Sequence, residues 1–311
     1  MYKEHYGFKE NPFSLVPDPE YLYLTKQHRL ALTLLKYGID MQAGLTVISG
    51  EVGSGKTTLI RRILKEMDDG ITVGLISNAH STFGDLLQWV LMSFDIKFDQ
   101  QNKSARYKML MDFLIQEYSK NKRTVLIIDE AQNMDVATLE ELRLLSNINA
   151  DKHLILQVVL VGQPELLELL RKPELRQLAQ RVSVNYNLKA LSYQETVEYI
   201  RYRLTIAGGE KPIFDKYAVA AIFYHSGGIP RLINTLCDFS LVYGFAEDTQ
   251  QVDLNLIMDV IKDKHNGGIF PEVTVENKEQ ESIRQLILHD KKMDINKLDE
   301  EKHRDEKITK L

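Results

Sequence analysis

Cysteine is nearly missing from this chain, because Cys237 is the only one among its 311 residues. A single cysteine cannot form a disulfide within the chain, which excludes the small disulfide-stapled secreted folds. Cys237 lies within an apolar pattern, so we interpret it as a buried packing residue rather than a nucleophile. The expected compartment is a reducing one.

Long hydrophobic runs are also lacking. The longest, "LILQVVLVG" (154–162), has the length of a buried strand and falls far short of the roughly 20 apolar residues that cross a bilayer. The opening "MYKEHYGFKENPF" contains no apolar region of the kind found in signal peptides. We therefore expect no membrane span and a cytoplasmic protein, or one held peripherally at the inner membrane through a partner.

A strong charge of one sign is absent as well. The formal net charge is −5, which produces no general attraction to nucleic acid but leaves room for a local basic patch. Hydrophobic residues make up 44% and charged residues 27% of the chain, as in ordinary soluble domains. The length suffices for one large or two modest domains with a sizeable core.

Apolar runs alternate with helical patterns through the first two thirds of the chain. Residues 1–25 are rich in Tyr, Phe and Pro and predict an extended N-terminal arm. Residues 26–190 predict an α/β domain, because strands that alternate with helices form a parallel sheet covered on both faces. The five expected strands are 45–49, 71–77, 124–129, 154–162 and 181–188.

The pattern becomes purely helical after residue 190. Residues 191–265 predict a helical subdomain with helices near 192–207, 215–225, 230–245 and 253–263. Residues 266–311 are densely charged with both signs and predict a disordered tail. Within this tail, the pattern allows one helix at about 277–289.

The stretch "GEVGSGKT" (50–57) places glycines and a lysine between a predicted strand and a helix. It fits G-x-x-x-x-G-K-[ST], in which glycines turn backbone N–H groups toward phosphate oxygens and the following helix adds its positive end. Lys56 would reach the β- and γ-phosphates of ATP, and the Thr57 hydroxyl would bind Mg²⁺. A glycine-rich turn with a chance lysine is the alternative. The predicted nucleotide-binding residues here are Gly50, Glu51, Val52, Gly53, Ser54, Gly55, Lys56, Thr57 and Thr58.

A second motif follows about 70 residues later, where the apolar strand in "TVLIIDEAQNM" ends in two carboxylates. Asp129 would hold Mg²⁺ through water, and Glu130 would polarise the water that attacks the γ-phosphate. An Asp-Glu pair after a strand can also be a simple helix cap. The glycine-rich loop upstream favours the catalytic interpretation, and the adjacent glutamate favours hydrolysis over phosphoryl transfer to a small molecule.

Two polar residues end other predicted strands. Gln163 closes the strand in "LVGQPEL" and could sense the γ-phosphate or the water, or could be a turn residue before Pro164. Asn78 follows the strand at 71–77 and could restrain Glu130 when the site is idle, although nothing in the sequence decides this.

Three arginines are candidates for contacts with the phosphates. Arg176 and Arg181 precede the last predicted strand. In a ring, one of them would face the γ-phosphate bound by a neighbouring subunit. The alternative is that both are surface residues that form ion pairs. Arg231 lies at the start of a predicted helix in "GGIPRLINTLC". The helix dipole is unfavourable for a cation at this end, and this cost favours a functional role for Arg231 as a sensor in the helical subdomain.

Taken together, these motifs resemble the AAA+ ATPase class, and more closely the ExeA/GspA-type secretion ATPases with their MshM-like and exopolysaccharide- or exosortase-associated relatives. The resemblance covers about residues 1–262 and is carried, in order, by "YGFKENPFSLVPDPEYLY", "ISGEVGSGKTTL", "IIDEAQNM", "LEELRLLSN", "VLVGQPEL", "LRQLAQRV" and "GGIPRLINTLCD". It implies a P-loop AAA+ domain with a helical lid, a nucleotide-dependent ring, expected to be a hexamer, and an adenine pocket near Asn11, Pro12 and Phe13.

The resemblance also implies a function: coupling the nucleotide state to assembly of a bacterial envelope machine through a partner protein. ExeA-type members often continue into a membrane span and a peptidoglycan-binding domain, and this chain shows only the charged tail, which favours the short cytoplasmic members. The alternative is an ATP-dependent DNA-binding regulator of transposition, with "RRILK" (61–65) and "KNKR" (120–123) as basic candidates. A third possibility is a nucleotide switch with negligible turnover, against which Glu130 argues.

Overall fold

The computed structural model describes residues 1–77, 85–98, 102–150, 153–209, 211–267 and 278–291. The chain forms two compact units. One comprises Leu24–Lys189, and the other combines Met1–Tyr23 with Ala190–Leu311. The N-terminal segment, which the sequence predicts as an extended arm, belongs to the helical unit.

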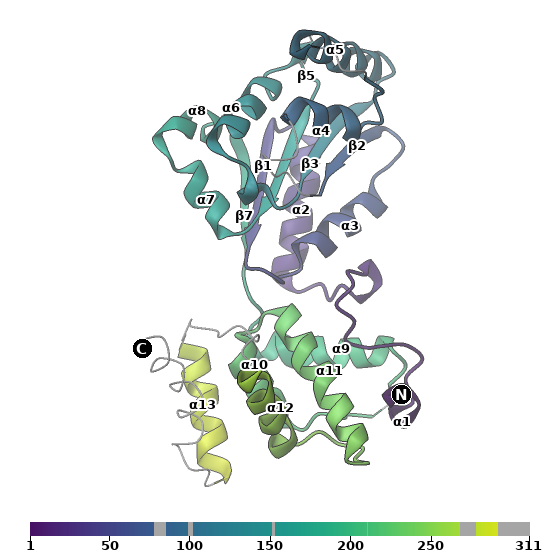
Figure 1. Ribbon diagram of the computed structural model, residues 1–311, viewed down its shortest axis with the longest axis vertical. Coiled ribbons are helices and arrows are strands. Elements are labelled where there is room, and N and C mark those ends of the chain that lie inside the picture. The colour runs from purple at the N-terminus through teal and green to yellow at the C-terminus, as the bar shows by residue number, and fades with distance from the viewer. Residues whose placement is uncertain (78–84, 99–101, 151–152, 210, 268–277, 292–311) are drawn as a thin grey trace. The chain divides into compact units, whose positions relative to one another are not determined.

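The first unit is built on a parallel sheet of five strands in the order β2-β3-β6-β1-β7 (Figure 1). The five-stranded parallel sheet predicted from the sequence is confirmed. The central strands β1 and β6 are buried along their whole length, as expected where helices cover both faces. The strands are β1 (Leu45–Gly50), β2 (Ile71–Ile76), β3 (Arg123–Ile128), β6 (Gln157–Gly162) and β7 (Val182–Leu188).

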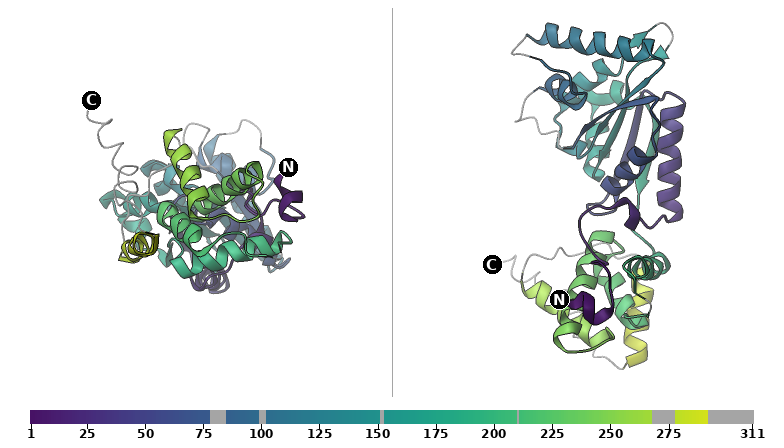
Figure 2. Two further views of the ribbon diagram at one scale, coloured as in Figure 1. Left: turned by 90° about the horizontal axis from the view of Figure 1, so that it is seen from below. Right: turned by 90° about the vertical axis from the view of Figure 1, so that its right-hand side faces the viewer.

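Helices lie on both sides of this sheet (Figure 2). Successive residues of each central strand belong to two separate cores, because side chains alternate between the two faces of a strand. Val47 belongs to the core on one face, with helices α4, α5, α6 and α7, while its neighbour Ile48 belongs to the core beneath α2 and α3. The helices are α2 (Lys26–Asp40), α3 (Lys56–Glu66), α4 (Leu86–Ser93), α5 (Lys103–Ser119), α6 (Val136–Leu145) and α7 (Pro164–Leu170).

Side-chain caps determine where four of these helices begin. Thr25, Asp85, Asn102 and Asp135 each accept a hydrogen bond from a backbone N–H of the first turn of α2, α4, α5 and α6, respectively. Each cap satisfies a donor that would otherwise have no partner within the helix. Local sequence therefore places the start of these elements independently of the tertiary fold.

The region around β6 differs from the sequence prediction of one long strand at 154–162. His153–Leu154 forms β5 and pairs with β4 (Asn149–Ala150) in a short antiparallel ladder, and only Gln157–Gly162 joins the main sheet. Ile155 and Leu156 pack in the core beside α6 instead of continuing the strand. The segment before β7 holds η4 (Pro173–Leu175) and α8 (Arg176–Ala179), which the pattern did not predict.

The second unit is helical and has its own core. Cys237 is fully buried in this core, and burial raises the pKa of its thiol, so the interpretation as a packing residue is confirmed. The helices are α9 (Tyr193–Ile206), α10 (Lys216–Ser226), α11 (Pro230–Ala246), α12 (Leu254–Asn266) and α13 (Lys278–Lys291), with α1 (Tyr2–Tyr6) and η1 (Pro19–Tyr21) from the N-terminal segment.

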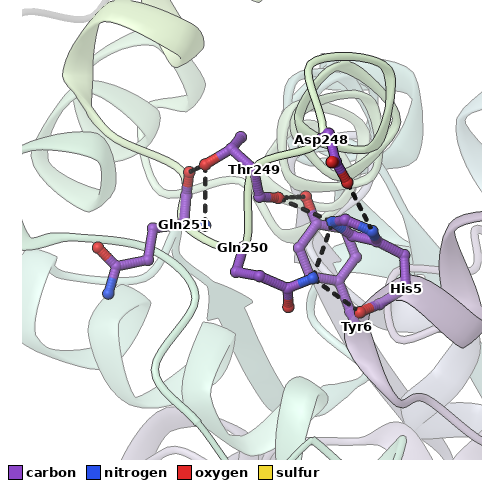
Figure 3. A network of polar contacts seen from close by, with 6 residues as sticks. All are labelled: His5, Tyr6, Asp248, Thr249, Gln250 and Gln251. Carbon is purple, nitrogen blue, oxygen red and sulfur yellow. Dashed lines mark hydrogen bonds and ion pairs between the residues drawn. The ribbon is translucent and has the colours of Figure 1, made fainter.

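Helix α1 is attached to the loop that follows α11 (Figure 3). The Tyr6 hydroxyl donates to the Thr249 carbonyl at 3.1 Å, and the His5 ring nitrogen Nε2 lies 2.9 Å from the same oxygen. The Gln250 amide in turn donates to the His5 carbonyl. These contacts tie the start of the chain into the helical unit.

Helix α13 lies within the region expected to be a disordered tail. Ile283 and Ile287 are buried against the helical core, and the helix packs on α10. The Glu279 carboxylate accepts a hydrogen bond from the Tyr193 N–H at the start of α9. The expected helix at 277–289 is therefore present, and residues 292–311 lie outside the described residues.

Candidate active site

The loop 50–57 leaves the carboxyl end of β1 and leads into α3, and it adopts a conformation that requires glycine at several positions. Gly53 and Gly55 have φ of 79° and 100°, in the left-handed region that side chains disfavour. A Cβ at Gly50 would lie only 2.6 Å from the Leu188 carbonyl oxygen. The Ser54 hydroxyl is buried and has no hydrogen-bond partner among the residues described. The glycine pattern is thus a steric requirement of this turn.

The Lys56 ammonium is folded back into the loop. Its Nζ donates to the carbonyl oxygens of Gly50 at 2.7 Å and Glu51 at 2.9 Å, and the residue is 5% exposed. Burial lowers the pKa of Lys56, while the nearby carboxylates of Glu130 and Asp129 act in the opposite direction. A bound anion would offset the free-energy cost of burying this ammonium, which is surrounded by backbone groups.

Thr57 and Asp129 form an oxygen pair beside the lysine. The Thr57 hydroxyl donates to Asp129 Oδ2 at 2.9 Å, and Asp129, at the end of β3, is 5% exposed. Burial raises the pKa of Asp129, opposed by its hydrogen bonds from Thr57 and from the Glu130 N–H. A hydroxyl and a carboxylate are ligands suited to Mg²⁺, which keeps most of its waters.

We expect Asp129→Asn to raise the melting temperature of the protein without nucleotide by a few degrees at neutral pH. Because the folded state raises the pKa of Asp129, ionising this carboxyl destabilises the fold above that pKa, and an amide removes the penalty. The difference in melting temperature between the variant and the unchanged protein decreases as the pH falls, because Asp129 is then protonated in both the folded and the unfolded state. Thermal melts of both proteins from about pH 5 to about pH 8 measure the effect. An unchanged or lower melting temperature of the variant contradicts this account.

The Glu130 carboxylate is held by two glutamines. Gln132 Nε2 donates to Glu130 Oε2 at 2.6 Å and Gln163 Nε2 donates to the same oxygen at 3.2 Å, while Gln132 Oε1 accepts the Gln163 N–H at 3.0 Å. Glu130 itself has a φ of 54°, in the left-handed region that non-glycine residues rarely adopt. The sequence pattern predicts roles for Glu130 and Gln163 but none for Gln132. Its position two residues after the glutamate in "DEAQN" was the only available signal.

The structure does not bring all of the predicted residues together. Asn78 lies outside the described residues. Arg181 is half-buried and donates to the Ser146 carbonyl at 3.5 Å, whereas Arg176 is exposed at the start of α8. Arg231 is exposed in the first turn of α11, in the helical unit.

The "NPF" segment also lies in the helical unit. Asn11 accepts the Phe13 N–H at 2.8 Å in a tight turn, and Phe13, 1% exposed, packs edge-on against Phe214. The buried guanidinium of Arg203 donates to the Pro12 carbonyl at 2.6 Å and to the Ser14 carbonyl at 3.0 Å. Arg203 thus fastens the N-terminal segment to α9, a contact that no motif in the sequence predicts.

The fold and this cluster define a P-loop protein of the AAA+ class. The family described as "AAA domain" matches residues 39–170. General secretion pathway protein A of Aeromonas hydrophila is 42% identical over 256 residues, which are 81% of this chain and 46% of that protein. The resemblance drawn from the sequence is confirmed: the chain carries an AAA+ ATPase domain of the ExeA/GspA type, and it spans less than half the length of that relative.

Solved structures support the same fold. The ORC2 protein of Aeropyrum pernix, solved as ADPNP–ADP complexes, matches with a TM-score of 0.61 and 16% identity, over 85% of this chain and 76% of that one. A Walker-type ATPase of Pyrococcus abyssi matches with a TM-score of 0.55 and 16% identity, over 83% and 78%. At such identities the likeness concerns the fold alone. Within the described residues, no helix has the length and apolarity that a membrane crossing requires.

Proposed function

We propose that this protein binds Mg-ATP at the loop 50–57, hydrolyses it, and uses the nucleotide cycle to assemble or operate a bacterial envelope machine. The observation that carries the proposal is the buried Lys56 ammonium inside the glycine loop, beside the Thr57–Asp129 pair and a hydrogen-bonded Glu130. This is the set of groups that phosphoryl transfer needs, since the protein mainly positions and neutralises charge.

The residues present fit the nucleotide and the ion. The buried Ser54 hydroxyl, unpartnered among the described residues, and the Lys56 ammonium offer donors for phosphate oxygens. Thr57 and Asp129 would hold Mg²⁺, which when bound neutralises charge on the β- and γ-phosphates. Lys56 would exchange its bonds to the Gly50 and Glu51 carbonyls for bonds to phosphate oxygens. Backbone N–H groups of 52–57 and the start of α3 would complete the cradle.

Glu130 is the proposed general base. Its carboxylate would accept the proton of the attacking water once the glutamines release it, and Gln163 would then sense the γ-phosphate. The present bonds from Gln132 and Gln163 support such a restrained state. Asn78 remains a second candidate for the restraining role.

The remaining assignments follow from the resemblance and stay proposals. A neighbouring subunit of a ring, expected to be a hexamer, would supply Arg176 or Arg181 to the γ-phosphate. Arg231 would contact the phosphates from the helical unit, and Asn11, Pro12 and Phe13 would lie near the adenine. The 42% identity to a protein named for the general secretion pathway supports an envelope partner.

No observation favours the transposition alternative. Three of the six basic candidates are paired with carboxylates: Arg62 with Glu66 at 2.5 Å, Lys120 with Glu117 at 2.8 Å, and Arg123 with Asp40 at 3.2 Å. Cations already neutralised within the chain contribute less to counterion release from a nucleic acid.

Calorimetry and phosphate release on the purified protein test the proposal. We expect ADP with Mg²⁺ to bind with a dissociation constant on the order of micromolar, and ATP turnover that duplex DNA does not stimulate. Absence of heat from adenine nucleotides, at protein concentrations that permit self-association, contradicts it. Stimulation by DNA that disappears steeply with salt would instead favour the transposition alternative.

A further inference from the structure

A buried histidine lies against the outside of the phosphate-binding loop. His28, in the first turn of α2, is 3% exposed, and its Nε2 lies 3.4 Å from the Ser54 carbonyl oxygen. A Cβ at Gly55 would come within 3.4 Å of the same nitrogen. The imidazole therefore packs directly against the Ser54–Gly55 peptide. None of the roles assigned above uses it.

The neighbours of the ring determine where its proton lies. The Ser54 carbonyl is only an acceptor, so the facing Nε2 must carry hydrogen for this contact to be favourable. On the other side, the Thr25 hydroxyl oxygen lies 2.8 Å from Nδ1 and accepts the His28 backbone N–H at 3.2 Å. A neutral ring protonated at Nε2 satisfies both contacts, because the Thr25 hydroxyl then donates to Nδ1. Thr25 is thus both the cap of α2 and the group that orients the imidazole.

The bond to Ser54 also constrains the next N–H. A trans peptide is planar, and its C=O and N–H point in opposite directions. Holding the Ser54 oxygen on the His28 side therefore turns the Gly55 N–H away from His28. In a loop of this motif the opposite side is the hollow that receives phosphate.

We propose that His28 is a positioning residue that orients the Ser54–Gly55 peptide for phosphate binding, acting through the hydrogen bond from its Nε2. The inference rests on the proposed nucleotide site. It links the helix α2, which precedes the sheet in the chain, to the phosphate cradle. His28 itself touches neither nucleotide nor metal.

A pair of variants that differ by one methylene tests this. In His28→Gln the amide nitrogen takes the place of Nε2 and can still donate to the Ser54 carbonyl, whereas in His28→Asn it lies at the level of Nδ1 and cannot reach. We expect ADP affinity, measured by calorimetry with Mg²⁺, to stay within about threefold for His28→Gln and to fall about tenfold or more for His28→Asn. Melting temperatures of the two variants record the loss of packing separately.

Equal ADP affinities of the two variants, with normal binding by the unchanged protein, overturn the proposal and leave the proposed function intact. Failure of the unchanged protein to bind ADP overturns both. The tautomer of His28 can be measured in the unchanged protein, without the Asn variant. In protein labelled with ¹⁵N-histidine, the His28 ring should carry its proton on Nε2. A ring protonated only on Nδ1 contradicts the proposed hydrogen bond.

Discussion

Lys56→Ala is expected to weaken the binding of ADP and ATP by roughly two orders of magnitude or more while the protein stays folded. The ammonium is the one cation that the structure places inside the glycine loop among the described residues, and charge-assisted bonds to phosphate are among the strongest that a side chain makes. Loss of two such bonds corresponds to a weakening of roughly 100-fold or more. Calorimetry with each nucleotide measures it.

Stability is expected to change little, because the fold pays a desolvation cost to bury this charge and burial lowers the pKa of Lys56. Circular dichroism and a thermal melt check the fold of the variant. Lys65→Ala is the matched control, since Lys65 is exposed on the same helix and should leave affinity unchanged. Nucleotide binding by Lys56→Ala within about threefold of the unchanged protein would contradict the assignment of the loop.

Glu130→Gln is expected to retain ATP binding and to lower turnover by about 100-fold or more, the usual contribution of a general base. The amide keeps the size of the side chain but can no longer accept a proton from water. The amide oxygen of the variant can take the place of Glu130 Oε2 and accept the same two bonds from Gln132 and Gln163, so the local structure should persist. Steady-state phosphate release and calorimetry with a non-hydrolysable ATP analogue separate the two effects.

Glu165→Gln is the control for charge alone, because the Glu165 carboxylate also raises the pKa of Lys56 but is not bonded to the two glutamines. Its turnover should stay within about threefold of the unchanged protein. If the unchanged protein and Glu130→Gln release phosphate equally slowly, the protein is a nucleotide switch rather than an ATPase. In that case Glu130→Gln should still bind ATP and ADP with different affinities.

Elements with local signals were predicted well. The strands β1, β3 and β7 and the capped helices α9 and α10 lie within a residue of the expected bounds, because periodicity and caps act over a few residues. The strand expected at 154–162 was shorter, since Leu154 pairs with β4 and the next two residues are buried in the core without joining the main sheet. Apolarity alone does not say whether a buried residue belongs to a strand.

The candidate site shows the same division. Lys56, Thr57, Asp129 and Glu130 were predicted from the spacing of two motifs. The structure places these residues close together, and their roles stay proposals. Gln132 and His28 have no such spacing: His28 precedes Ser54 by 26 positions and contacts it only because α2 packs against β1 and α3. A contact of this kind depends on the packing of helices.

The sequence by itself determined that this chain has a parallel sheet, a glycine loop that only glycines can form, a threonine in the first turn of the helix after that loop, and an Asp-Glu pair directly after another strand. These follow from the steric and hydrogen-bonding demands of short segments. Only the tertiary structure decided that two glutamines hold Glu130, that His28 supports Ser54, and that Arg203 binds the N-terminal segment to the helical unit. Such hydrogen bonds join residues brought together by burial of apolar surface, and short-range pattern does not encode them.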